Sequence, residues 1–329
     1  MSTDSVTESH GPGRQLGSSV AIVGAGAVAG LMASWLHGAG HPPPTVCART
    51  PFDAFTIVGD GAGHDNTRRC PVAVVTSPDA VSAVDWVFLT VKAHDTAAVQ
   101  PWLDALIGQG TVVVVLQNGI DHVERVQSIT GTARIVPALI FAAAERTSPA
   151  TIHHRLGASL TVPNTSAGRA FAELMAGGVH VTASDDFLTE SWRKLLVNIG
   201  ASPITALTLR NTDVLREPLV EQLCAKLLAE TRSVGVAVGA HLTDTDVDNV
   251  MRLYRSYPDD VGSSMLYDRL AGRRLEYDLL LGAAVQAART HNIPVPVLET
   301  LLALTAAADF PRGSFTQEER GQSLPHSPT

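Results

Sequence analysis

Three polar side chains recur at a spacing that places them on one face of a helix. Lys194, Asn198 and Ser202 follow one another at intervals of four residues, so they stack in a row at about 3.6 residues per turn. The residues around them are mostly apolar, and a solvent-exposed helix face would normally be wider and richer in charge. We therefore interpret the row as the wall of a site, and we expect Pro203 to kink or end the helix near its far end.

An ammonium group in such a wall is suited to carbonyl reduction. When a hydride attacks a ketone, negative charge develops on the oxygen, and Lys194 could stabilise that charge and then supply a proton. The pKa of an unperturbed lysine is about 10.4. Burial would lower it and a nearby carboxylate would hold it up, a balance that the sequence leaves open. The chain holds only three lysines against 21 arginines, which favours special roles for lysines, because arginine cannot give up its proton.

The hydride donor would bind at a glycine-rich turn near the N-terminus. An apolar run at Ser19–Val23 leads into the turn at Gly24–Gly30 and then into a helical segment at Leu31–His37. A strand, a glycine turn and a helix in this order are typical of dinucleotide sites, in which the helix N-terminus faces the pyrophosphate. The predicted cofactor-binding residues of the turn are Gly24, Ala25, Gly26, Ala27, Val28 and Ala29.

Small residues in this turn have separate roles. Gly24 permits the tight turn, Gly26 lets a pyrophosphate approach the backbone, and Ala29 lets the helix pack closely against the strand. The alternative interpretation is a glycine-rich turn that binds no ligand.

The second predicted strand, Thr45–Ala48, ends at Arg49. A site specific for NAD usually has an acidic residue here, on the ribose 2′-hydroxyl. An arginine could instead bind a 2′-phosphate with two parallel hydrogen bonds. Arg49 therefore favours NADP over NAD, the alternative being a solvated loop arginine.

Two further polar residues follow predicted strands. Asp85–Val91 leads into Lys92, and Thr111–Leu116 leads into Gln117 and Asn118. Ligands of doubly wound sheets bind beyond the carboxyl ends of the strands, so Lys92 could contact cofactor phosphate or ribose, and Asn118 the nicotinamide ribose or the substrate. The alternatives are a solvated lysine and an ordinary Asn-Gly turn.

These elements predict an α/β fold, with an N-terminal Rossmann-type doubly wound sheet followed by an all-α domain. Strand patterns stop near Asp185, and helical periodicity follows. We expect a disordered leader at 1–18, an NADP-binding domain at 19–185, a helical substrate domain at 186–311 and a disordered tail at 312–329. Further strands are expected at Val72–Thr76, Arg134–Phe141, Ser159–Val162 and Val179–Thr182, of which Arg134–Phe141 and Ser159–Val162 would continue the same sheet, with a helix near Ala167–Met175. The expected helices of the second domain span 187–208, 213–238, 244–256, 263–291 with a break near Gly272, and 296–309.

The composition excludes several classes of partner. The formal net charge is −8 and no basic cluster stands out, which argues against nucleic acid and against an anionic membrane. Cys47, Cys70 and Cys224 have no metal-ligand spacing, so no metal site is expected, and they are typical of reduced cytosolic thiols. No signal peptide is evident, and we expect a cytoplasmic protein.

A last group of polar residues lies in the helical region. Ser263 and Ser264 start a predicted helix, and Glu276 follows Arg273 and Arg274. Taken singly, serines at a helix start are most often N-caps, and a helical glutamate beside arginines is most often a surface ion pair.

Taken together, these stretches resemble the ketopantoate reductase (2-dehydropantoate 2-reductase) family, over roughly residues 19–310. The matching stretches are Gly24–Gly30, Thr90-Val91-Lys92-Ala93, Gln117-Asn118-Gly119, Trp192–Leu195 with Asn198, and Ser263–Asp268 with Glu276. The resemblance implies a Rossmann domain joined to a helical domain of the 6-phosphogluconate dehydrogenase C-terminal type. It also implies NADPH-dependent reduction of ketopantoate to pantoate, on the route to pantothenate and coenzyme A.

The resemblance also implies roles for individual residues. Lys194 would be the catalytic lysine and general acid, and Glu276 its acidic partner at the substrate. Asn198 and Ser264 would hold the substrate. Asn118 would lie between cofactor and substrate, with Lys92 and Arg49 on NADP.

Ser202 departs from the family pattern, because many members carry an asparagine there. It remains a candidate substrate-binding residue, but it keeps open a reductase of another small 2-oxo acid or of an imine. A further alternative, from a different class, is a non-catalytic NADP-binding protein. The oligomeric state is left open, with a homodimer as one candidate.

Overall fold

Six parallel strands form the sheet that carries the glycine turn. The computed structural model describes residues 18–64 and 66–309, so the predicted leader, apart from residue 18, and the predicted tail lie outside the described residues. The strand order is β5-β2-β1-β6-β7-β8, which is the order of a Rossmann fold. The bounds are β1 Val20–Val23, β2 Thr45–Cys47, β5 Ala73–Val75, β6 Trp86–Leu89, β7 Val112–Val115 and β8 Arg134–Pro137.

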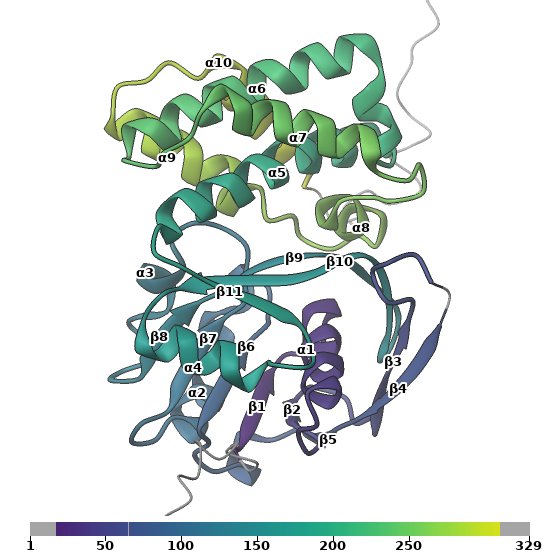
Figure 1. Cartoon of the computed structure of the whole chain (residues 1–329), viewed down its shortest axis with the longest axis vertical. Coiled ribbons are helices and arrows are strands. Elements are labelled where there is room, and N and C mark those ends of the chain that lie inside the picture. The colour runs from purple at the N-terminus through teal and green to yellow at the C-terminus, as the bar shows by residue number, and fades with distance from the viewer. Residues whose placement is uncertain (1–17, 65, 310–329) are drawn as a thin grey trace, which may run out of the picture.

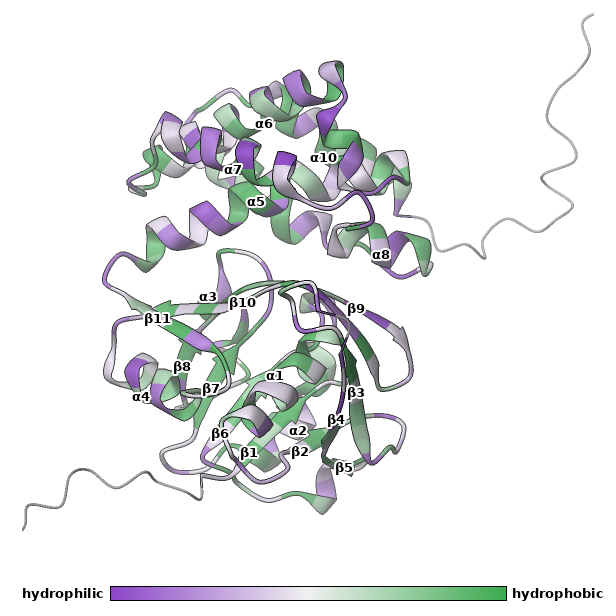
Figure 2. Ribbon diagram, turned by 45° about the vertical axis from the view of Figure 1, so that its right-hand side comes forward, coloured by the Kyte–Doolittle hydropathy of each residue, from purple (hydrophilic) through white to green (hydrophobic). Residues whose placement is uncertain are grey.

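The central strands of this sheet are buried along their whole length. Every residue of β1, β6 and β7 is buried, and Figure 2 shows the hydrophobic colour that runs through these strands. Continuous apolar runs are expected because helices cover both faces of such a sheet. One face packs on α1 (Ala27–Gly38), and the other on α2 (Gln100–Leu106) and α3 (His122–Val126).

A second, five-stranded sheet lies on the far side of α1 (Figure 1). It has the order β11-β10-β3-β4, with β9 paired to β10. The contact with α1 is close, because a Cβ on Gly30 would lie 2.4 Å from Cγ1 of Ile152 in β10. Its strands are β3 Ala54–Val58, β4 Thr67–Pro71, β9 Leu139–Ser148, β10 Thr151–Pro163 and β11 His180–Ser184.

The second sheet corrects the prediction that Arg134–Phe141 and Ser159–Val162 both continue the first sheet. The expected strand Arg134–Phe141 is two strands, and Ala138 separates β8 of the first sheet from β9 of the second. Ser159–Val162 belongs to β10, and Val179–Thr182 to β11. The helix expected near Ala167–Met175 is present as α4 (Ser166–Leu174).

The remaining chain folds into helices that stand above the two sheets (Figure 1). The predicted Rossmann-type domain followed by a helical domain is therefore confirmed. The helices are α5 Phe187–Thr208, α6 Pro218–Ala237, α7 Asp244–Ser256, α8 Ser264–Leu270, α9 Ala283–Thr290 and α10 Pro296–Ala308. Shorter 3-10 and π-helical turns are η1 Pro78–Ala80, η2 Ala93–Asp95, η3 Ala97–Val99, η4 Thr212–Arg216 and η5 Asp278–Gly282.

Helix α5 is the centre of the helical core. Leu195, Leu196 and Ile199 are fully buried there, and burial of such a side chain contributes about 1.5–3 kcal/mol. Trp192 packs where Gly235 of α6 has no side chain, since a Cβ on that glycine would lie 3.0 Å from the indole.

Pro203 does not end α5, contrary to one of the two expected outcomes. The helix continues to Thr208 and ends at Leu209, which has a left-handed backbone (φ 56°). Two carbonyls in the turns before the proline accept hydrogen bonds from other helices: Tyr254 Oη donates to Val197 O at 2.6 Å, and Cys224 Sγ to Gly200 O at 3.6 Å. Within the described ranges, no helix is both long enough and apolar enough to cross a membrane.

Candidate active site

A cleft of about 1580 Å³ runs between the sheet domain and the helices. Its walls bring together the glycine turn, the ends of β2, β6 and β7, and the polar face of α5. The predicted site residues that line it are Gly24, Ala25, Gly26, Ala27, Val28, Arg49, Lys92, Asn118, Lys194, Asn198, Ser202, Ser264 and Glu276. Ala29 alone among the predicted residues is absent from the wall, because it is fully buried behind the turn.

The glycine turn has the shape that a dinucleotide phosphate requires. Gly24 has a φ of 115°, and a Cβ there would lie 2.8 Å from Thr90 Oγ1. A Cβ on Gly26 would meet nothing within 4 Å, so its backbone faces open space at the start of α1. The turn therefore fits a pyrophosphate group held by backbone N–H groups and the helix dipole.

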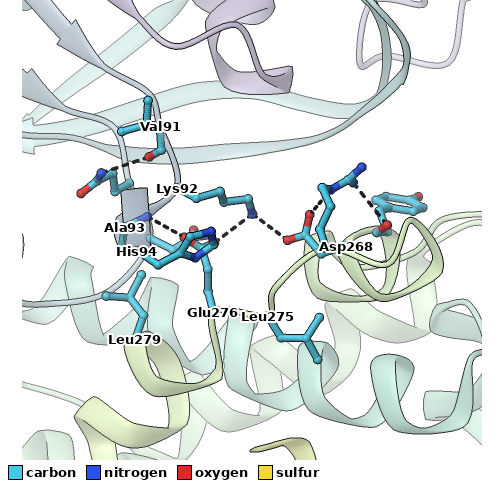
Figure 3. A network of polar contacts seen from close by, with 12 residues as sticks. Val91, Lys92, Ala93, His94, Asp268, Leu275, Glu276 and Leu279 are labelled. Carbon is cyan, nitrogen blue, oxygen red and sulfur yellow. Dashed lines mark hydrogen bonds and ion pairs between the residues drawn. The ribbon is translucent and has the colours of Figure 1, made fainter. Parts of the chain in front are cut away.

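Lys92 joins the two domains through carboxylates of the helical domain (Figure 3). Its Nζ lies 2.8 Å from Asp268 Oδ2 and 2.9 Å from Glu276 Oε2. The backbone N–H of Ala93 also donates to Glu276 Oε1, at 3.1 Å, and Arg273 Nε lies 2.8 Å from Asp268 Oδ1.

These contacts hold both partners in their charged forms. Burial acts to lower the pKa of Lys92, but Glu276 and Asp268 outweigh it and raise that pKa above its usual value. Burial likewise acts to raise the pKa of Glu276, and Lys92 outweighs it, so the pKa ends below its usual value. An ionised carboxylate thus stands at the floor of the cleft at neutral pH.

Lys194 is in a different electrostatic environment. Its Nζ lies 4.8 Å from the centre of the Phe141 ring in β9, and no ion pair joins it to a carboxylate among residues 18–64 and 66–309. Although the side chain is partly exposed in the cleft, the surrounding protein lowers its pKa to about 8. Burial therefore determines the pKa of Lys194, with no opposing effect from Glu276. Lys194 can exchange a proton near neutral pH.

Asn118 and Asn198 meet across the domain boundary. Asn198 Nδ2 donates to Asn118 Oδ1 at 3.3 Å, so the loop after β7 is in direct contact with the row on α5. Gln117 fixes the loop beneath them by donating to Val91 O at 3.0 Å and to Thr96 Oγ1 at 2.8 Å. Arg125 donates to Asn118 O at 3.1 Å.

The serines of the site differ in their surroundings. Ser263 is the N-cap of α8, since its Oγ accepts from Leu266 N at 3.1 Å; the ordinary interpretation thus holds for that serine. Ser264 is exposed on the cleft wall, and Ser202 is buried at the far end of the α5 row.

Two expectations about this site differ from the structure. Glu276 is neither helical nor paired with a neighbouring arginine, because it lies in a segment without helix or strand and bonds to Lys92. Its carboxylate is therefore not directly bonded to Lys194, and Lys92 is occupied by protein carboxylates at the point where we expected cofactor.

Several residues of the site were not identified from the sequence. Asp268 forms an ion pair with Lys92, as Glu276 does. Phe141 packs beside Lys194, and Arg146 of β9 lines the cleft. Asp268 lies in the stretch Ser263–Asp268 that resembles the family, but the sequence indicated no role for it. Phe141 and Arg146 carried no usable signal, because the second sheet that positions them was not predicted.

The fold and the cleft together define an oxidoreductase of the dehydrogenase type, which uses a nicotinamide cofactor. The family model "Ketopantoate reductase PanE/ApbA" matches residues 20–167, and its C-terminal counterpart matches residues 186–309. The chain belongs to the ketopantoate reductase family.

Individual relatives agree with this assignment. A 2-dehydropantoate 2-reductase of Mycobacterium tuberculosis is 41% identical over 295 residues, which cover 89% of this chain and 98% of the relative. One from Caulobacter vibrioides is 37% identical over 292 residues, covering 88% and 99%. A solved dimeric ketopantoate reductase from Staphylococcus aureus has a TM-score of 0.78 at 26% identity, covering 88% of this chain and 98% of that one.

Proposed function

We propose that this chain reduces ketopantoate to pantoate with NADPH, on the route to pantothenate and coenzyme A. The observation that carries the proposal is the lysine of lowered pKa, Lys194, which shares one cleft with a turn shaped for a dinucleotide phosphate. Membership of the family, and the relatives named above, supply the substrate.

Each polar residue of the cleft would have a separate role in the reaction. Bound NADPH would supply the hydride to the C2 ketone. Lys194 would stabilise the charge that develops on the ketone oxygen and give it a proton. Asn198 and Ser264 would hold the substrate's polar groups, with Asn118 between substrate and cofactor.

Other residues of the cleft orient these groups. Glu276, kept ionised by Lys92 and Ala93 N–H, would present a fixed acceptor to the substrate hydroxyl. Arg49 would bind the 2′-phosphate, which is our reason for proposing NADP rather than NAD.

Consumption of NADPH with ketopantoate tests the proposal directly. We expect turnover with ketopantoate to exceed that with simple 2-oxo acids, and turnover with NADPH to exceed that with NADH. Ser202 in place of the common asparagine supports a second candidate, a reductase of another 2-oxo acid or an imine. Preference for such a compound over ketopantoate would establish that candidate. Tight NADPH binding without any turnover would instead indicate a non-catalytic binding protein.

The pH dependence of the reaction should report Lys194. Because a general acid must carry its proton, kcat/KM for reduction should be level below the pKa of about 8 and fall roughly tenfold per pH unit above it. Ketopantoate stays ionised throughout this range, so it contributes no inflection. A profile that stays level to pH 10 would contradict the assigned role.

We further propose that residues 19–185 form the NADP-binding domain and residues 186–311 the substrate domain. We also propose a cytoplasmic enzyme with no nucleic-acid or membrane partner, and a homodimer, since the solved S. aureus relative is dimeric.

A further inference from the structure

Two arginines line the cleft without an acidic partner. Four arginines contribute to its walls, namely Arg49, Arg146, Arg273 and Arg274. Arg273 pairs with Asp268 at 2.8 Å, and Arg274 lies 3.7 Å from Asp278. Within the described part of the chain, Arg49 and Arg146 form no ion pair. The positive charge of each is therefore available to an anionic ligand in the cleft.

Arg146 lies beside the glycine turn although it belongs to the other sheet. Its Nη1 is 3.4 Å from the carbonyl oxygen of Ala25. The neighbouring Glu145 does not neutralise it, because that carboxylate lies 3.2 Å from Arg155. Residue 146 is also held in place by the sheet, since it pairs with Ile152 of β10. Strand β9 thus holds the guanidinium of Arg146, which has no acidic partner among the described residues, beside the glycine turn.

Among the described residues, the glycine turn itself offers no cationic side chain to a diphosphate. Residues 24–30 are all glycine, alanine or valine, so the turn offers only backbone N–H groups and the dipole of α1. Lys92, the other candidate, is committed to Asp268 and Glu276. Arg49 follows β2, where the adenosine ribose is held in Rossmann domains.

We infer that Arg146 binds the pyrophosphate of the cofactor, beside the residues that lead into the N-terminus of α1. The inference rests on the proposed function, because it takes the ligand to be a nicotinamide dinucleotide. A guanidinium is suited to the role, since its planar N–H groups match phosphate oxygens in pairs. The second sheet thereby becomes part of the cofactor site, which in the Rossmann motif alone would end at the glycine turn.

The roles of Arg49 and Arg146 can be distinguished by measuring how each variant binds NADPH and NADH. NADPH and NADH share the pyrophosphate and differ at the 2′-phosphate. Arg146→Ala should therefore weaken binding of both dinucleotides by a similar factor, about 10- to 100-fold. Arg49→Ala should weaken NADPH alone. The measurement is calorimetric titration of each purified full-length variant with each dinucleotide, without substrate.

Arg252→Ala is the matched control. Arg252 is exposed on α7, has no ion pair within the described residues and does not line the cleft, so its variant should bind both dinucleotides as wild type does. Unchanged affinity in Arg146→Ala would overturn the inference. So would a loss confined to NADPH, which would assign Arg146 to the 2′-phosphate. Wild-type chain that binds NADPH but leaves ketopantoate unchanged would overturn the proposed function and not the role of Arg146.

Discussion

The Lys194→Ala variant is expected to bind NADPH with wild-type affinity and to reduce ketopantoate about 10²- to 10⁴-fold more slowly. The loss should appear in kcat, because the ammonium acts on charge that develops only in the transition state. Within the described residues Lys194 forms no ion pair, and burial lowers its pKa to about 8. Removing it should therefore leave the unfolding temperature at pH 7 no lower than that of wild type.

The difference in stability between Lys194→Ala and wild type should depend on pH. Below pH 8 the lysine is charged in both the folded and the unfolded chain, and the cost of burying it is fully present. As the pH rises from 8 to about 10.4, the folded protein releases its proton first and the cost disappears. The stability advantage of the variant should shrink over the same range.

Lys226→Ala provides the matched control for Lys194→Ala. Lys226 lies exposed on α6, outside the cleft, so its variant should retain wild-type kcat. Near-normal turnover by Lys194→Ala would remove the proposed mechanism. Loss of NADPH affinity in that variant would assign the lysine to the cofactor instead.

The second large effect is expected for Glu276→Gln. Glutamine keeps the shape of the side chain, but it removes the charge that Lys92 holds and that we assign to the substrate. Loss of a hydrogen bond to a charged group costs about 1.5–3 kcal/mol, so kcat/KM for ketopantoate should fall about 10- to 100-fold, mainly through KM. The measurement is the initial rate over a range of ketopantoate concentrations.

A structural effect of the Glu276 substitution can be separated from a functional one. In the present structure Lys92 also lies 2.8 Å from Asp268 and its side chain is 36% exposed. The lysine of the Glu276→Gln variant would therefore still have a charged partner, and the variant should unfold at nearly the denaturant concentration of wild type. Glu173→Gln, at an exposed residue of α4 outside the cleft, should change neither stability nor kinetics. Wild-type kcat/KM in Glu276→Gln would show that the carboxylate has no part in substrate binding.

The parts of the fold that follow from local pattern were predictable. The row on α5 was found because the helical period fixes which side chains share a face, and the helix has the predicted bounds, 187–208. The Rossmann strands were found because buried parallel strands are continuous apolar runs. The glycine turn was found because its chemistry requires small residues at fixed spacing.

The second sheet could not be predicted in the same way. Strand β4 has one buried residue, Cys70, among four exposed ones, so neither an apolar run nor an alternating pattern marks it. Strand β9 follows β8 after a single residue, and only pairing with β10 assigns it to another sheet. Such pairing depends on contacts between distant segments, which no local pattern encodes.

The missed pairing in the site has the same origin. Lys92 and Glu276 are 184 residues apart, and the sequence contains no measure of the distance between them. The position of Lys92 after a strand placed it in the cleft, and the family resemblance placed Glu276 there, but neither argument indicated that the two side chains form an ion pair. The sequence indicated that burial and a nearby carboxylate would have opposite effects on the pKa of Lys194. Only the folded structure shows that burial alone shifts this pKa.

The sharing of one ammonium by two buried carboxylates also limits how this chain can diverge. A change at Lys92 alone leaves Asp268 and Glu276 buried with fewer compensating charges, and a buried charge that loses its partner is strongly destabilising. A change at either carboxylate alone leaves the lysine with the other, which is a milder step. Substitutions should therefore accumulate in a fixed order, a carboxylate first and the lysine last, and descendants of this chain that retain both acids should retain the lysine.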